Sequence, residues 1–120
     1  GTMQGRSLPN DLRRLILAIL RRYGFRSGGG WLSRLDVDRT FTAGNGSRQE
    51  TITAFVSQRL GVPAAQIELN SYLRVVRRLP QASERDPFEG DEGMILRTIE
   101  TLVALVRALD RYLSENGRRG

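Results

Sequence analysis

The basic residues are the groups in this sequence best suited to bind a ligand. All nineteen are arginines in a chain of 120 residues, and thirteen acidic residues leave a formal net charge of +6 at pH 7. A guanidinium group is planar, stays protonated and offers paired N–H donors that match phosphate or carboxylate oxygens. GC-rich coding explains the preference for arginine over lysine equally well, but it does not explain the charge. Such a balance favours a nucleic acid, an anionic membrane surface or an acidic protein as partner.

The arginines predicted to contact phosphate come from two parts of the chain. They are Arg13, Arg14, Arg21, Arg22, Arg74, Arg77 and Arg78. Each phosphate contact would make the affinity fall as the salt concentration rises. The competing interpretation is that these side chains form solvated helix faces that keep the protein soluble. We expect DNA rather than RNA if the partner is a nucleic acid.

Groups for catalysis are scarce. The chain has no cysteine and no histidine, which excludes thiolate zinc sites and removes the commonest general base and metal ligand. An enzyme would depend on carboxylates such as Asp36 and Asp38, and the acidic residues 86–92 lack the spacing of an EF-hand loop. The glycine-rich stretches 27–30 and 43–46 match no phosphate-binding fingerprint. We therefore expect no enzyme, no cofactor and no metal.

The first two arginine pairs lie on a predicted helix from about Pro9 to Tyr23. Arg14 and Arg21 fall opposite its apolar stripe, and Gly24 is a natural C-terminal stop. The stripe consists of Leu12, Leu15, Ile16, Ile19, Leu20 and Tyr23.

The middle of the chain changes period. Apolar and polar residues alternate from Trp31 to Phe41, which predicts a half-buried strand. Ile67 to Val76 fits either a strand or a helix entered through Pro63. We favour the strand, because the first strand needs a partner for its backbone amides.

Between the two predicted strands, Ser47 and Glu50 have the spacing of a capping box. They predict a helix that ends at Gly61. Its predicted apolar face consists of Ile52, Phe55, Val56 and Leu60.

The chain around Gly61 also resembles a helix-turn-helix motif. The small Ser57 lies four residues before the turn glycine, and Ile67 falls where the second helix of that motif packs inward. Asn70 departs from the pattern, because the motif normally has an apolar residue there. The resemblance implies a DNA-binding function in which Gln66 reads an adenine by paired hydrogen bonds.

The last predicted helix, Gly93 to Asn116, shows the a/d spacing of a heptad repeat. Its apolar arc covers about half of the circumference, which is more than one contact surface needs. The predicted oligomerisation residues are Ile95, Ile99, Leu102, Val106, Leu109 and Leu113.

These elements predict an α+β fold in the order helix, strand, helix, strand, long helix, completed by a homodimer; the alternative is an all-α helix-turn-helix domain. Residues 1–7 are expected to be a tag remnant and disordered start, 8–116 a single domain and 117–120 a frayed tail. The predicted function is non-enzymatic nucleic-acid binding through arginine–phosphate contacts. The alternative is a protein-interaction or oligomerisation module that uses the last helix. No apolar run approaches the length of a membrane span, so we expect a cytoplasmic protein.

Overall fold

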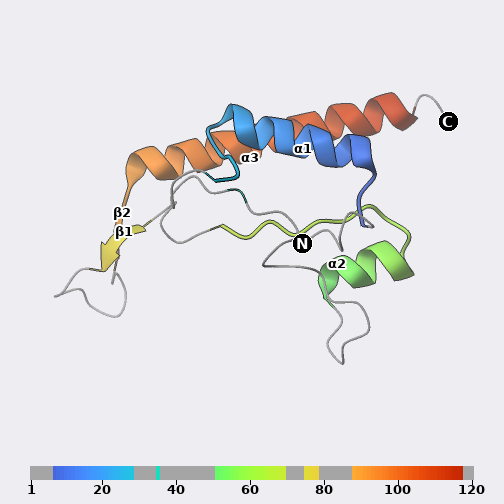
Figure 1. The fold of residues 1–120 in the computed structure, drawn as a ribbon, viewed down its shortest axis with the longest axis horizontal. Coiled ribbons are helices and arrows are strands. Elements are labelled where there is room, and N and C mark those ends of the chain that lie inside the picture. The colour runs from blue at the N-terminus through green and yellow to red at the C-terminus, as the bar shows by residue number, and fades with distance from the viewer. Residues whose placement is uncertain (1–6, 29–34, 36–50, 70–74, 79–87, 118–120) are drawn as a thin grey trace. The chain divides into compact units, whose positions relative to one another are not determined.

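A computed structural model describes residues 7–28, 35, 51–69, 75–78 and 88–117 (Figure 1). Most of these residues are helical. In chain order the elements are helix α1 (Asn10–Arg22), the short helix α2 (Ile52–Ala54), the π-helix η2 (Phe55–Arg59), strands β1 (Val75–Arg78) and β2 (Phe88–Gly90), and helix α3 (Glu92–Gly117). The chain divides into two compact units, residues 1–29 with 33–68 and residues 30–32 with 69–120.

Helix α1 confirms the first predicted helix to within a residue or two at each end. It ends in a Schellman motif, in which the Gly24 amide donates to the Arg21 carbonyl (3.0 Å) and the Phe25 amide to the Leu20 carbonyl (3.0 Å). This geometry requires a left-handed residue, and Gly24 has a φ of 91°. Phe25 is buried, as are Leu12 and Leu17 in the helix itself. The predicted stripe residues other than Leu12 are half-buried, and the stripe did not include the buried Leu17, which lies one turn from both Arg14 and Arg21.

Helix α2 begins later than the sequence predicts. Thr51 has an extended backbone, and its hydroxyl accepts a hydrogen bond from the Ala54 amide at 3.1 Å, so Thr51 is the N-cap. The predicted capping box of Ser47 and Glu50 therefore does not start this helix; both residues lie outside the described ones. The hydroxyls of Ser47 and Thr51 are both chemically able to cap a helix, and the sequence around them does not show which one does.

The predicted end of this helix is confirmed, but the predicted apolar face is wrong. Gly61 has a φ of 66° and ends the helical segment. The buried residues are Thr53 and Ala54, whereas Ile52, Phe55 and Leu60 are exposed. A helix this short, continued in wider π geometry, does not keep the 3.6-residue period on which the prediction depended.

The second helix of a helix-turn-helix motif is absent from the described residues. After Gly61, residues 61–69 contain no helix and no strand. This stretch is attached to the start of unit 1, where the Ala64 amide donates to the Ser7 carbonyl at 2.9 Å. The mainly helical character of the alternative fold agrees with the described residues, but its helix-turn-helix motif does not, because residues 61–69, where the second helix would begin, form a loop.

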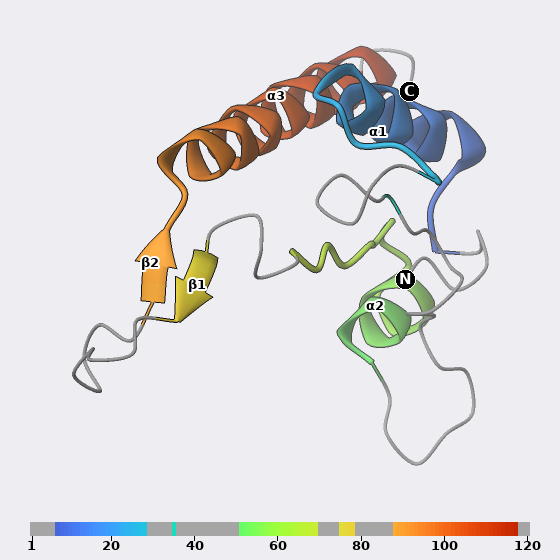
Figure 2. The same ribbon diagram turned by 60° about the vertical axis from the view of Figure 1, so that its left-hand side comes forward.

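The predicted α+β fold is also wrong. The described part is mainly helical, and its one sheet is an antiparallel ribbon of the short strands β1 and β2, which leads directly into α3 (Figure 2). The predicted strand Ile67–Val76 is not formed at residues 67–69, and β1 starts only at Val75. Its partner is Phe88–Gly90 rather than Trp31–Phe41, which lies outside the described residues except for Leu35, a residue in no strand. Closing a short loop to a nearby segment costs less entropy than reaching a distant one.

Helix α3 confirms the long C-terminal helix. Asp91 caps its N-terminus, because one carboxylate oxygen accepts from the Met94 amide at 2.9 Å. Two threonine hydroxyls donate back to carbonyls one turn earlier, Thr98 to Met94 (2.8 Å) and Thr101 to Arg97 (2.6 Å). Thr101 and Leu105 are the buried residues of this helix.

Candidate functional site

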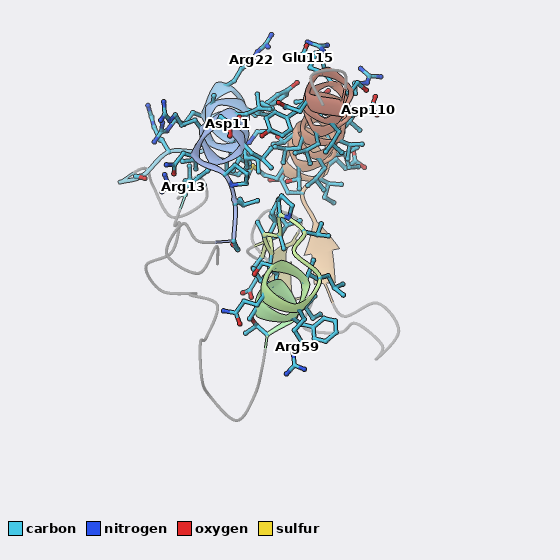
Figure 3. The ribbon with its side chains drawn as sticks, turned by 90° about the vertical axis from the view of Figure 1, so that its right-hand side faces the viewer. Asp11, Arg13, Arg22, Arg59, Asp110 and Glu115 are labelled. Carbon is cyan, nitrogen blue, oxygen red and sulfur yellow. The ribbon has the colours of Figure 1, made fainter. Side chains whose placement is uncertain are left out.

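The outer surface of α1 is formed by arginines. Arg14, Arg21 and Arg22 are exposed, and Arg13 is half-buried. Arg14 and Arg21 lie about two turns apart on the same side of the helix, opposite the half-buried apolar stripe. Figure 3 looks along α1 and shows Arg22 extending outward, with Arg13 on another side of the helix. These four residues, Arg13, Arg14, Arg21 and Arg22, are called the arginine face below.

Few acidic groups accompany this face along the chain. Residues 10–28 contain five arginines and a single acid, Asp11. Asp11 lies in the first turn, where a carboxylate also complements the positive end of the helix dipole. The fifth arginine, Arg26, is exposed just after the Schellman motif. Sequence reasoning missed Arg26, although its position close behind the helix-ending Gly24 indicated a residue near the same helix end.

Helix α3 has the opposite charge character. Its residues include three arginines and four acids, so its formal charge is slightly negative. Among the described helices, positive charge is therefore concentrated on α1. A cluster of positive charge on one helix is the pattern expected of an electrostatic binding surface.

The other predicted nucleic-acid contacts are not brought together with this face by the described structure. Arg74 lies outside the described residues, and Arg77 and Arg78 are placed only as backbone positions of β1. Gln66 is exposed in the loop after Gly61, and its side-chain amide donates to a carboxylate oxygen of Glu68 at 3.2 Å. Without a recognition helix, the proposed reading of adenine by Gln66 loses its structural basis.

The predicted oligomerisation residues form an outward apolar stripe on α3. Val106 and Leu113 are each 66% exposed, Ile99 is 51% exposed and Leu102 is 36% exposed. Ile95 and Leu109 are half-buried. The buried residues Thr101 and Leu105 lie about a third of a turn away around the helix. Helix α3 therefore has two apolar sides, of which one is exposed.

A second exposed apolar group, which includes most of the predicted apolar face, lies on α2, η2 and the loop that follows. Ile52 is 78% exposed, and Leu60 and Val62 are at least half exposed. The Arg59 guanidinium lies over the Phe55 ring at 5.8 Å from its centroid, within the range of a cation–π contact. Figure 3 shows Arg59 directed away from the helix. No sequence signal distinguished this surface from a core face.

The described residues provide no metal centre and no membrane-spanning helix. They contain no group of three or more His, Cys, Asp or Glu side chains arranged to hold a metal ion. None of the described helices is both long enough and apolar enough to cross a bilayer.

Comparison with protein-family models, with curated proteins and with solved structures finds no match for this chain. The functional inference therefore depends on the arginine face and the stripe of α3 alone.

Proposed function

We propose that this protein is a non-enzymatic nucleic-acid-binding module that acts in the cytoplasm and contacts phosphates through the arginine face of α1. The observation that carries the proposal is the concentration of arginines on the single helix α1, where Arg14 and Arg21 are exposed on the same side and Asp11 is the one acid. Arg14 and Arg21 are exposed opposite the half-buried apolar stripe, although Leu17, one turn from each of them, is buried.

The geometry of α1 supports backbone contacts rather than base recognition. Arg14 and Arg21 are about 10 Å apart along the helix axis, which is similar to the width of the DNA major groove. Two guanidinium groups at this spacing can each meet a phosphate without entering a groove. Such contacts position a protein on nucleic acid but carry little sequence information. We therefore propose weak sequence preference, with duplex DNA preferred to RNA.

The proposal is tested by fluorescence anisotropy with labelled duplex DNA, single-stranded DNA and RNA of one sequence at low salt. We expect binding to duplex DNA, and at least tenfold weaker binding when Arg14→Gln and Arg21→Gln are combined. Glutamine has a helix propensity similar to that of arginine, so α1 should persist. The matched control combines Arg107→Gln and Arg111→Gln, which removes the same charge from exposed positions of α3.

The control variant is expected to bind like the unmodified protein. Absence of binding to all three nucleic acids at low salt would remove the proposal. Equal weakening in both double variants would show that net charge, and not the arginine face, determines the affinity.

A further inference from the structure

The outward stripe of α3 is not used by the proposed nucleic-acid contacts. Its six residues, Ile95 to Leu113 in steps of four and three, follow a heptad repeat. In this phase Ile99, Val106 and Leu113 occupy a positions, and Ile95, Leu102 and Leu109 occupy d positions. Four of the six side chains are exposed, and the other two are half-buried. Monomeric proteins rarely expose a continuous apolar surface of this kind without a partner.

The residue types select a two-stranded arrangement. Within parallel coiled coils, β-branched residues at a with leucine at d favour two strands over three or four. The central layers of the stripe fit this rule, with Ile99 and Val106 at a and Leu102 and Leu109 at d. Only the two end layers differ, where Ile95 is at d and Leu113 at a.

We infer that α3 pairs with α3 of a second copy of this chain in a parallel, in-register, two-stranded coiled coil. A second copy presents the same alternating spacing at every layer, which an unrelated partner would have to reproduce. The stripe itself carries no charge, and the flanking e positions include the apolar Leu96 and Val103 with a single acid, Asp110. Self-pairing therefore buries no like-charge contact at the centre of the seam.

The pairing is expected to be reversible, in the micromolar range, because the seam covers fewer than three heptads and isolated coiled coils usually need three or four. Each copy also carries a net charge of +6, so the two copies repel one another. Salt screens this repulsion, and we expect dimerisation to tighten as salt increases. Nucleic-acid binding should weaken under the same change, so failure of one proposal is distinguishable from failure of the other.

Sedimentation equilibrium of the full chain, from low to high micromolar concentration, tests the pairing. We expect a mass that rises from 13.5 kDa toward twice that value. Val106→Glu should raise the dimer dissociation constant at least ~100-fold, because two facing carboxylates would be buried in the seam. Val106 is mostly exposed within one chain, so this variant should keep the helical signal in circular dichroism.

The matched control is Ser114→Glu, which adds the same charge to the same helix at an exposed b position. It should dimerise like the unmodified protein. A protein that stays monomeric at every concentration, or a Val106→Glu variant that dimerises as well as the control, would overturn the inference.

The direction of pairing is tested with one cysteine, because the chain has none of its own. In a parallel pair, Leu113→Cys places two thiols in the same layer, and oxidised glutathione should convert them into an intermolecular disulfide. In an antiparallel pair, position 113 lies opposite Ile95, and the two thiols are about 27 Å apart along the axis. A dimer by mass that forms no disulfide would therefore overturn the parallel arrangement.

Discussion

The salt dependence of nucleic-acid binding measures how many arginines contact phosphate. Each contact with duplex DNA releases condensed counterions and contributes a slope of about −0.9 to the plot of log affinity against log salt concentration. If the four residues of the arginine face each meet one phosphate, the expected slope is about −3.6. The affinity should then fall about 150-fold between 50 and 200 mM salt.

Combining Arg14→Gln with Arg21→Gln removes the two arginines that share the outermost side of α1. The slope should fall to about −1.8, and the same salt change should then weaken binding only about 12-fold. Near 0.1 M salt the double variant should bind about 60-fold more weakly than the unmodified protein, if the two lines meet at 1 M. Both effects follow from the number of contacts removed and need no assumption about the sequence of the DNA.

The assay is fluorescence anisotropy with one labelled duplex at four salt concentrations. The Arg107→Gln and Arg111→Gln control should keep the slope of the unmodified protein, because α3 carries slightly more acids than arginines. A slope that is unchanged in the α1 variant, or that falls equally in the α3 control, would refute the assignment of phosphate contacts to α1. Circular dichroism of each variant verifies that the helices are retained.

Three further predictions concern stability and are measured by urea unfolding. Asp91→Ala should lower the free energy of unfolding by about 1 kcal/mol, because it removes the cap from the Met94 amide, whereas Asp91→Asn should retain most of it. Gly61→Ala should lower the free energy of unfolding by about 1–2 kcal/mol through the positive φ alone, since nothing lies within 4 Å of the added Cβ. Gly61→Asn should lower it less, because asparagine tolerates this conformation. Gly117→Ala, at a helical position that is also open, should not lower it. Ile52→Gln should lower the free energy of unfolding by under about 0.5 kcal/mol because Ile52 is exposed, whereas Leu12→Ala should lower it by about 2–5 kcal/mol because Leu12 is buried. Equal losses in the two variants would show that Ile52 is buried.

The two long helices were predictable because their signals are local. An apolar stripe followed by a glycine predicts α1, and in the structure that glycine, Gly24, forms the Schellman motif that ends the helix. A heptad over several turns likewise predicts α3. In both cases the residues that begin, face and end the helix lie within one continuous segment, so no knowledge of distant parts of the chain is needed.

The strand pairing was not predictable from such signals. The strand β2 is only Phe88–Gly90, too short to show any alternation, and it lies among the acidic residues 86–92. Its identity as the partner of β1 depends on a contact between two segments of the chain. The same limit explains the error at α2, where the sequence period indicated a core face that a few helical residues in α and π geometry do not form.

The candidate site was predictable in part. The exposure of Arg14 and Arg21 follows from their position opposite the apolar stripe, and the structure agrees with it. The proposed role of Gln66 depended on a helix that residues 61–69 do not form. The exposure of the α3 stripe could not be decided from the heptad alone, because a heptad has the same spacing whether its partner lies in the same chain or in another.

The distribution of charge indicates that α1 and α3 have different partners. An outer face built from arginines cannot pair with its own copy, because two such faces would bring like charges together in every turn. It does suit a polyanion, whose phosphates repeat at short intervals. The stripe of α3 has the reverse properties. It offers no cation to a phosphate, and its apolar surface is removed from water only when another apolar surface covers it. The arginines of α1 cannot serve the partner of α3, and the apolar stripe of α3 cannot serve a polyanion. Substituting the arginines of α1 should therefore weaken nucleic-acid binding and leave the mass of the proposed dimer in solution unchanged.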